Sequence, residues 1–177
     1  MSYELRAHTA DVAVAASGDT LEATVAAVAD GLAAASCDEI PGTGAGAGES
    51  DDRFTLEVRA ESREALLFEY LDELIYLRDV RLELPVDNRV QTLERIEEDA
   101  GDENAGDESQ SEGTDDEGAL EVPVSGDGHA DRWRLAADAH GIPLSTIDAR
   151  EVKAVTYSEM RLEDVDGGWE AYVVFDV

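Results

Sequence analysis

The sequence contains almost no cysteine, which excludes the classes of protein that disulfide bonds hold together. Cys37 is the only cysteine among the 177 residues. A single cysteine excludes an intramolecular disulfide, and it fits a reducing compartment. Cys37 comes directly after an Ala-rich helical pattern, so we expect a small buried side chain there rather than a nucleophile.

Long hydrophobic runs are absent as well. No segment approaches the roughly 20 apolar residues that a transmembrane helix requires. The first residues, MSYELRAHTAD, lack the basic and then apolar pattern of a signal sequence. We therefore expect a soluble cytoplasmic protein with no membrane contact. Its 43% hydrophobic content predicts one folded domain over residues 1–177.

Basic residues are scarce: 13 Lys and Arg face 43 Asp and Glu, which gives a formal net charge of −30. Such a surface repels phosphate backbones, so we expect no direct, sequence-specific binding of nucleic acid. The acidity has two possible explanations, a basic partner or life in very high salt, where short Debye lengths screen self-repulsion. We favour high salt, because the acidic residues are spread over the whole chain and only one basic residue, Lys153, is a lysine.

The motifs of common catalytic sites are also missing. The sequence has no P-loop, no GxGxxG that opens a helix after a strand, no nucleophile elbow and no HExxH. The three histidines, His8, His129 and His140, are too scattered to suggest a zinc site. For His129 and His140 we expect surface positions or hydrogen-bonded positions in the core.

The N-terminal third predicts a hairpin and a helix. Residues 3–7 and 12–16 are typical of two short strands that flank the sequence HTAD. In the segment 17–36, Asp19 is placed to cap a helix and Glu22 to complete a capping box. One apolar stripe follows at helical spacing: Leu21, Val25, Val28 and Leu32.

The middle of the chain predicts a strand, a second helix and another strand. Residues 53–60 alternate between apolar and polar, as in a half-buried strand. Ser62 is placed to cap a helix over residues 63–77, and residues 80–86 resume strand alternation. The helix has a wide apolar face formed by Leu66, Leu67, Tyr70, Leu71, Leu74 and Ile75.

Two polar stretches interrupt this pattern. Residues 41–52 are rich in glycine and predict a flexible loop. Residues 97–118 contain eleven acidic residues, no basic ones and no aromatic ones. Such a segment buries too little apolar surface to offset the entropy of ordering, so we expect a disordered acidic insertion. A functional acidic segment is the alternative.

The C-terminal third predicts strands only. The segments 119–124, 132–139, 151–163 and 169–177 have strand character, and DVDGG at 164–168 predicts a hairpin turn. The fold class that follows is α+β, with two helices packed on one face of a largely antiparallel sheet of six or seven strands.

Two carboxylates meet where the chain ends. The final strand reads VVFDV, so the side chain of Asp176 is followed at once by the α-carboxylate of Val177. If the first hairpin brings Asp11 alongside, three hard oxygen ligands converge. These suit Ca²⁺, Mg²⁺ or Mn²⁺ rather than zinc. The alternative is an acidic chain end that is simply exposed to water.

Lys153 is unusual because every other basic position carries arginine. Arginine cannot supply a compact charge on a flexible stem or a readily shifted pKa. A requirement for an ammonium group would explain this lysine, and chance in an arginine-biased chain is the alternative.

Three motifs in order carry a family resemblance. HTADVAVAASGDTLEATVAAVADGL (8–32), ALLFEYLDELIYL (65–77) and EVKAVTYSEMRLEDVDGGWEAYVVFDV (151–177) resemble the N-terminal hairpin and helix, the second helix and the C-terminal hairpin of the archease family. The resemblance implies the archease fold for this chain. The Gly-rich loop and the acidic insertion are not required by the family pattern.

The resemblance also implies a function. Archeases are not enzymes but cofactors of the RtcB-type RNA ligase, which joins tRNA exon halves. They promote guanylylation of the ligase's active-site histidine and restore it for further turnovers. The resemblance leaves open a more general chaperone-like role toward partners such as a tRNA methyltransferase. An independent metal-dependent hydrolase is a third possibility, although no base or nucleophile accompanies the carboxylates.

The resemblance further assigns roles to single residues. It implies a divalent metal ion, Ca²⁺ first with Mg²⁺ or Mn²⁺ as alternatives, bound by Asp11, Asp176 and Val177. Lys153 matches the lysine that the family needs for activation. Three further residues would support the site without binding the metal: His8, Thr156 and Tyr157. The native metal, the docking surface and the oligomeric state stay open.

Overall fold

The computed structural model describes residues 1–8, 11–41, 53–96 and 132–177. Several predicted features lie outside these residues: the turn residues Thr9 and Ala10, the Gly-rich loop from residue 42, the acidic insertion at 97–118, the strand at 119–124 and His129.

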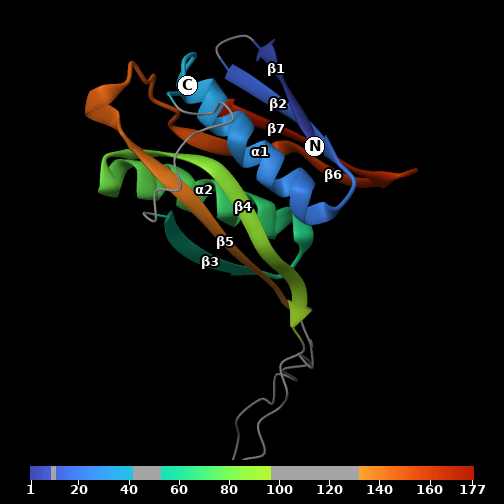
Figure 1. Ribbon diagram of the computed structural model, residues 1–177. Coiled ribbons are helices and arrows are strands. Elements are labelled where there is room, and N and C mark those ends of the chain that lie inside the picture. Colours follow the sequence, from blue (N-terminus) through green and yellow to red (C-terminus); the bar gives the residue numbers. More distant parts are fainter. Residues whose placement is uncertain (9–10, 42–52, 97–131) are drawn as a thin grey trace, which may run out of the picture.

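The described residues form seven strands and two α-helices (Figure 1). This composition confirms the predicted α+β class. A short 3-10 helix, Leu144–Thr146, follows the fifth strand. The elements in chain order are β1 (Ser2–His8), β2 (Asp11–Gly18), α1 (Leu21–Ser36), β3 (Arg53–Ala60), α2 (Arg63–Arg81), β4 (Glu83–Ile96), β5 (Arg132–Pro143), β6 (Ala154–Val165) and β7 (Gly168–Asp176).

The strands are divided between two antiparallel sheets, whereas the sequence predicted one. One sheet has the order β1-β2-β7-β6 and the other has the order β3-β5-β4. Both helices contact both sheets (Figure 1). Twelve of the 16 residues of α1 are buried, so this helix needs apolar partners on more than one side. Two sheets provide them.

The start of α1 differs from the prediction in its cap. Thr20, not Asp19, caps the helix, and its hydroxyl accepts a hydrogen bond of 3.1 Å from the backbone nitrogen of Ala23. Because the helix begins one residue later than the capping-box spacing requires, Glu22 is its second residue. The predicted apolar stripe of α1 is confirmed, since all four of its side chains are buried.

The second helix keeps its predicted cap and is longer than predicted. The hydroxyl of Ser62 accepts a hydrogen bond of 3.1 Å from the backbone nitrogen of Ala65. The helix continues to Arg81 and ends at Leu82, which has left-handed backbone angles (φ 56°, ψ 36°). The predicted strand at 80–86 is therefore wrong at its start, and β4 begins at Glu83. The six predicted apolar residues of α2 are buried.

The C-terminal hairpin forms as predicted, with small differences. Gly167 lies in the turn between β6 and β7 with φ 93°, a value that favours glycine. Strand β6 begins at Ala154 rather than at residue 151. Its pairing with β7 is interrupted between Thr156 and Arg161, where the register shifts.

Two further predictions concern burial and membranes. Cys37 is buried, with only 3% of its surface exposed, as predicted for a small core residue. Among the described residues, no helix combines the length and the apolar character needed to cross a membrane.

Candidate functional site

Two aspartates from opposite ends of the sequence meet at one end of the four-stranded sheet. Asp11 is the first residue of β2, and Asp176 is the last residue of β7. They are direct partners in the antiparallel ladder between these strands. Directly opposite residues have Cβ atoms about 4.5–5.5 Å apart and point to the same face of the sheet. The structure thus brings together the two carboxylates that the sequence singled out.

Both aspartates lie on the sheet face that is turned away from the helices. Val14 and Val173 face each other across β2 and β7, and both belong to the core. Because successive side chains alternate between faces, the odd-numbered positions of β2 and the even-numbered positions of β7 point outward. Asp176 is exposed and Asp11 is half-buried.

Lys153 and Val177 join the aspartates at this end of the sheet. The backbone nitrogen of Lys153 donates a hydrogen bond of 2.8 Å to the carbonyl oxygen of Asp176. Its side-chain nitrogen Nζ donates one of 3.3 Å to the main-chain oxygen of Val177. Lys153 is exposed, whereas Val177 is half-buried and packs against the core. We call Asp11, Lys153, Asp176 and Val177 the tip.

The segment before Lys153 is fixed to both helices. The backbone nitrogen of Arg150 donates a hydrogen bond of 2.7 Å to the carbonyl oxygen of Ser36 at the end of α1. Arg78 of α2 donates one of 3.2 Å to the carbonyl oxygen of Arg150. Val152 is 1% exposed and belongs to the core. Lys153 therefore extends from a well-anchored backbone.

The three residues expected to support the site lie at different distances from it along the sheet. His8 pairs with Asp11 in the ladder between β1 and β2, and its side chain is outside the described part of the structure. Thr156 is half-buried on β6 and pairs with Val174. The ring of Tyr157 makes an edge contact with Phe68 of α2, with 5.6 Å between the ring centroids. Tyr157 thus packs toward α2.

The donor chemistry of the tip fits a hard divalent cation in part. Carboxylate and main-chain oxygens are the ligands that Ca²⁺, Mg²⁺ and Mn²⁺ prefer. Within the described ranges, however, no three His, Cys, Asp or Glu side chains gather into a metal-binding group. A third protein ligand would have to be the main-chain oxygen of Val177, which Lys153 contacts.

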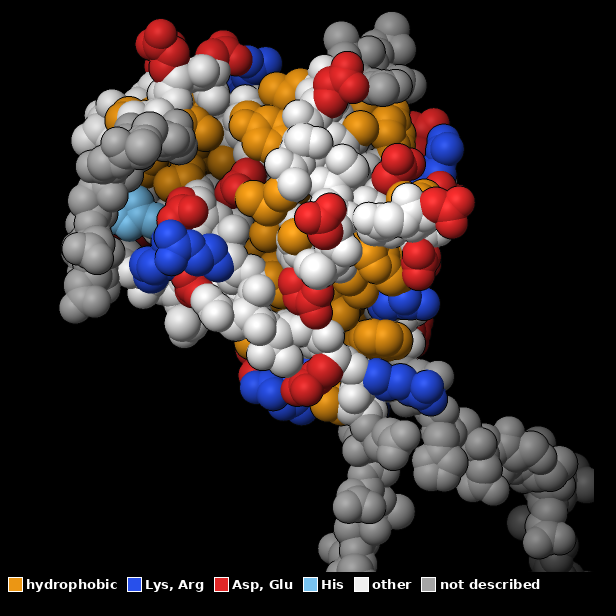
Figure 2. Space-filling model, turned by 45° about the vertical axis from the view of Figure 1, so that its right-hand side comes forward, with side chains coloured by type: hydrophobic (Ala, Val, Ile, Leu, Met, Phe, Trp, Pro, Cys, Tyr) orange, Lys and Arg blue, Asp and Glu red, His pale blue; other side chains and the backbone are white. Residues whose placement is uncertain are grey.

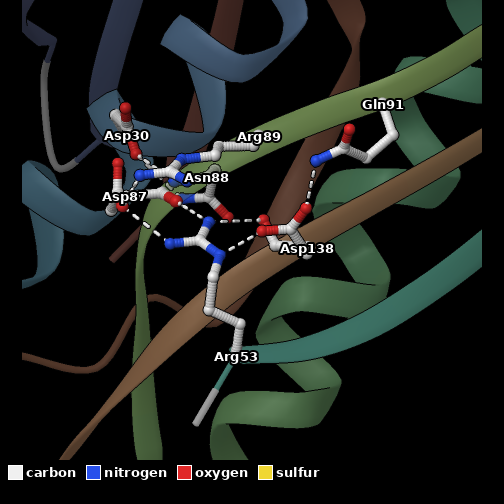
Figure 3. A network of polar contacts seen from close by, with 7 residues as sticks. All are labelled: Asp30, Arg53, Asp87, Asn88, Arg89, Gln91 and Asp138. Atoms are coloured by element: carbon white, nitrogen blue, oxygen red, sulfur yellow. Dashed lines mark hydrogen bonds and ion pairs between the residues drawn. The ribbon is translucent and has the colours of Figure 1, made fainter. Parts of the chain in front are cut away.

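A second cluster of polar side chains lies where β3, β4, β5 and α1 meet (Figure 3). Arg53 of β3 forms ion pairs with Asp138 of β5 and, at 2.6 Å, with Asp87 of β4. Asp30 of α1 accepts two hydrogen bonds of 3.0 Å from Asn88, one from its backbone nitrogen and one from its side chain. This cluster links helix α1 to the three-stranded sheet, and we call it the Arg53 cluster.

Burial and hydrogen bonding shift the pKa values of the Arg53 cluster in opposite directions. Burial raises the pKa of Asp30 above its usual 3.8, and the hydrogen bonds from Asn88 offset only part of that rise. Burial also acts to raise the pKa of Asp138, but hydrogen bonds from Gln91 and Arg53 outweigh it and leave this pKa lowered. Burial strongly raises the pKa of Tyr70, whose hydroxyl lies 3.5 Å from Asn88 Oδ1.

The sequence analysis missed the Arg53 cluster, although one signal was visible. Asp138 interrupts the apolar stretch LAADA of a strand, at a position that is 9% exposed. A buried carboxylate needs a positive partner or several donors. The identity of that partner, Arg53, depends on the pairing of β3 with β5 and could not be read from spacing. His140 is half-buried on β5 and is the ladder partner of Arg53, whereas Asp138 is paired with Thr55.

The acidic surface is visible in the space-filling view. Figure 2 shows Asp and Glu side chains scattered over the visible face, between apolar groups, while Lys and Arg gather in a few places. On this face the acidic side chains are therefore spread out and do not form a single patch.

The fold and the tip define a class of small α+β protein in which two helices lie against two antiparallel sheets and two aspartates face each other at the end of one sheet. The particular family follows from comparison with known proteins. The model of the Archease protein family matches residues 3–177. This chain belongs to the archease family.

Relatives and a solved structure agree with this assignment. The chain is 31% identical to Protein archease of Methanosarcina mazei over 175 residues, which cover 99% of this chain and 95% of the relative. It is 30% identical to Protein archease of Pyrococcus furiosus over 181 residues, which cover 99% and 98%. The solution structure of Methanobacterium thermoautotrophicum protein 1598 has the same fold, with a TM-score of 0.63, 24% identity and coverage of 99% and 98%.

Proposed function

We propose that this protein activates an RtcB-type RNA ligase in tRNA processing and is not itself the catalyst. In this role it promotes guanylylation of the active-site histidine of the ligase and allows multiple turnovers. Membership of the archease family supports the proposal. One observation supports it most directly: four residues meet at one end of the sheet, namely Asp11, Lys153, Asp176 and Val177. These are the residues to which the family resemblance assigns the metal site and the activation.

The proposal includes a divalent metal ion at the tip, with Ca²⁺ as the first candidate. Asp11, Asp176 and the main-chain oxygen of Val177 would hold it. When bound, such an ion supplies positive charge between two facing carboxylates. His8 would help to position the turn before Asp11, since it is paired with Asp11 in the ladder.

Lys153 acts in the proposal through its position and not as an acid or base. Its backbone is fixed to Asp176, so its ammonium group stays at the tip. A compact positive charge there can contact anionic groups at the nucleotide site of the ligase, although the protein as a whole has a net charge of −30.

The proposal also places the protein in a salt-rich cytoplasm. At a net charge of −30, self-repulsion destabilises the compact state at low ionic strength. High salt removes this repulsion, and many hydrated carboxylates keep such a surface soluble.

One experiment tests the activation. Purified RtcB-type ligase is incubated with GTP and Mn²⁺, with and without this protein, and the rate of ligase guanylylation is followed. We expect a faster rate with the protein present, and an Asp11→Ala variant that has lost most of the effect. An unchanged rate, together with reduced aggregation of a tRNA methyltransferase by this protein, would instead support a chaperone-like role.

A further inference from the structure

A hollow on the molecule lies away from the tip, further along the same sheet. It has a volume of about 360 Å³ and is lined by residues of all four strands, β1, β2, β6 and β7. Its outward-facing lining lies four to six residues beyond the aspartates, which corresponds to about 13–20 Å along the strands. It lies on the outer face, away from the two helices. We call it the outer groove.

The outer groove is built from two rows of side chains that cross the sheet. The first row consists of Ser2, Ser17, Glu170 and Glu163, which are successive partners in the strand ladders. The hydroxyls of Ser2 and Ser17 lie 3.2 Å apart, which confirms that both point to the same face. At the other end of the row, two carboxylates face each other directly across β6 and β7.

The second row consists of Glu4, Ala15, Tyr172 and Arg161, again successive ladder partners. The guanidinium of Arg161 stacks over the ring of Tyr172, at 5.5 Å from the ring centroid. The small side chain of Ala15 leaves space at the centre. The two rows therefore combine carboxylates, the ring of Tyr172 and hydroxyl groups with the guanidinium of Arg161.

The direct pairing of Glu163 with Glu170 concentrates negative charge at one end of the outer groove. Like charges directly opposite each other in a sheet are destabilising. The guanidinium of Arg161 lies over the ring of Tyr172, in the neighbouring row. A cationic group between the two glutamates would relieve their repulsion, and the neighbouring ring and hydroxyls suit the stem of a long side chain.

We propose that the outer groove binds a basic, extended segment of a partner protein through its lysine or arginine side chains. The charge of the groove is complementary to such a segment, and its length across four strands suits several side chains. A polyanion would be repelled by Glu163 and Glu170. The inference rests on the proposed function for the identity of the partner, the RNA ligase, for which the groove adds a second contact besides the tip.

The test uses a double variant, Glu163→Gln with Glu170→Gln, and a control with the same change in charge. The control is Glu69→Gln with Asp72→Asn, two exposed positions of α2. Affinity for the ligase is measured by calorimetry at several salt concentrations, and guanylylation is measured at a saturating concentration of each variant.

We expect the groove variant to bind the ligase about tenfold more weakly at low salt, with an unchanged maximal rate of guanylylation. Charges at the edge of an interface affect the association of the two proteins more than the chemical step. The control should change affinity less than twofold. Unchanged affinity of the groove variant would overturn the proposal. An equal loss in both variants would also overturn it, because net charge alone would then explain the effect.

A direct titration separates the groove from the proposed function. Hexa-arginine peptide is added to the protein, and backbone amide shifts are followed by NMR. Shifts that concentrate at Ser17, Glu170 and Tyr172, and that the groove variant loses, support the proposal even if the ligase does not respond. Shifts spread evenly over the molecule overturn it. The same shifts on addition of Ca²⁺ or Mg²⁺ alone also overturn it, in favour of an ion site.

Discussion

Asp11 and Asp176 lie directly opposite each other in the antiparallel ladder between β2 and β7. Like charges directly opposite each other disfavour strand pairing, and a positive charge close to both offsets that effect. Lys153 is bonded to the backbone of Asp176 and reaches Val177 with its side chain. The four residues thus form a small, strongly polar surface whose parts depend on one another.

Adding residues after Val177 should weaken the proposed metal site. The extension converts a carboxylate into a neutral amide, so one negative charge is lost from the ligands, and it crowds the tip. Affinity for hard divalent cations depends on ligand charge and geometry, and should therefore fall. The measurement is calorimetric titration with Ca²⁺ or Mn²⁺.

Two controls accompany this prediction. Asp11→Ala with an unmodified C-terminus should lose affinity to a similar extent, since it also removes one anionic ligand. An N-terminal extension should have little effect on metal affinity. If the C-terminally extended protein binds the ion as tightly as the original, Val177 is not a ligand.

Lys153→Arg should impair activation of the ligase, although it keeps the positive charge. The planar guanidinium is larger than the ammonium group and cannot occupy the same place beside Val177. We expect guanylylation to slow by about tenfold, with an unchanged melting temperature because the side chain is exposed. Wild-type stimulation by the variant would make Lys153 an ordinary surface charge.

The Arg53 cluster should make stability depend on pH in a defined way. The pKa of Asp138 is lowered from its usual 3.8. Ionised Asp138 therefore contributes fully to folding stability above about pH 4, near the pKa of this group in the unfolded chain. The contribution is lost as the pH falls through the lower pKa of the group in the folded protein. Asp138→Asn should cost about 1–3 kcal/mol of unfolding free energy at pH 7 and make the loss below pH 4 less steep.

Asp30 provides the comparison, because its pKa is shifted upward. Its contribution to stability is greatest at low pH and decreases as the pH rises through its folded pKa. In Asp30→Asn the side-chain oxygen can still accept from Asn88, so this change should cost less at pH 7 than Asp138→Asn. Urea unfolding of both variants between pH 3 and pH 7 measures the difference. An equal loss at every pH would contradict the assignment of opposite shifts.

Gly168→Ala should destabilise the C-terminal hairpin. A Cβ atom at this position would lie 2.3 Å from the carbonyl oxygen of Gly18, a backbone atom that cannot move aside cheaply. We expect a loss of about 1–3 kcal/mol in urea unfolding. Gly141→Ala is the matched control, because its closest contact would be the flexible end of Glu83. The control should cost less than the hairpin variant, and a larger cost would refute the steric argument.

The melting temperature should rise with salt. The Debye length falls from about 10 Å at 0.1 M to about 3 Å at 1 M, so repulsion among the surface carboxylates is screened. Circular dichroism in KCl between 0.1 M and 2 M measures this dependence. A constant melting temperature would remove the high-salt explanation and favour a basic partner as the reason for the acidity.

The sequence by itself determined the features that depend on neighbouring residues. The cap at Ser62, the apolar stripes of both helices and the glycine turn at 164–168 all follow from short-range hydrogen bonding and side-chain periodicity. The motifs HTAD and VVFDV likewise singled out Asp11 and Asp176, because unusual residues at the ends of strands are visible in the sequence.

Only the tertiary structure decided which of these features meet. The pairing of β2 with β7, the division of the strands into two sheets and the ion pair of Arg53 with Asp138 join segments far apart in the chain. The longer α2 and the cap at Thr20 also depend on packing, since alternative boundaries differ little in local energy. Strand register is fixed by many side chains packing together, and that sum cannot be read from any single stretch of sequence.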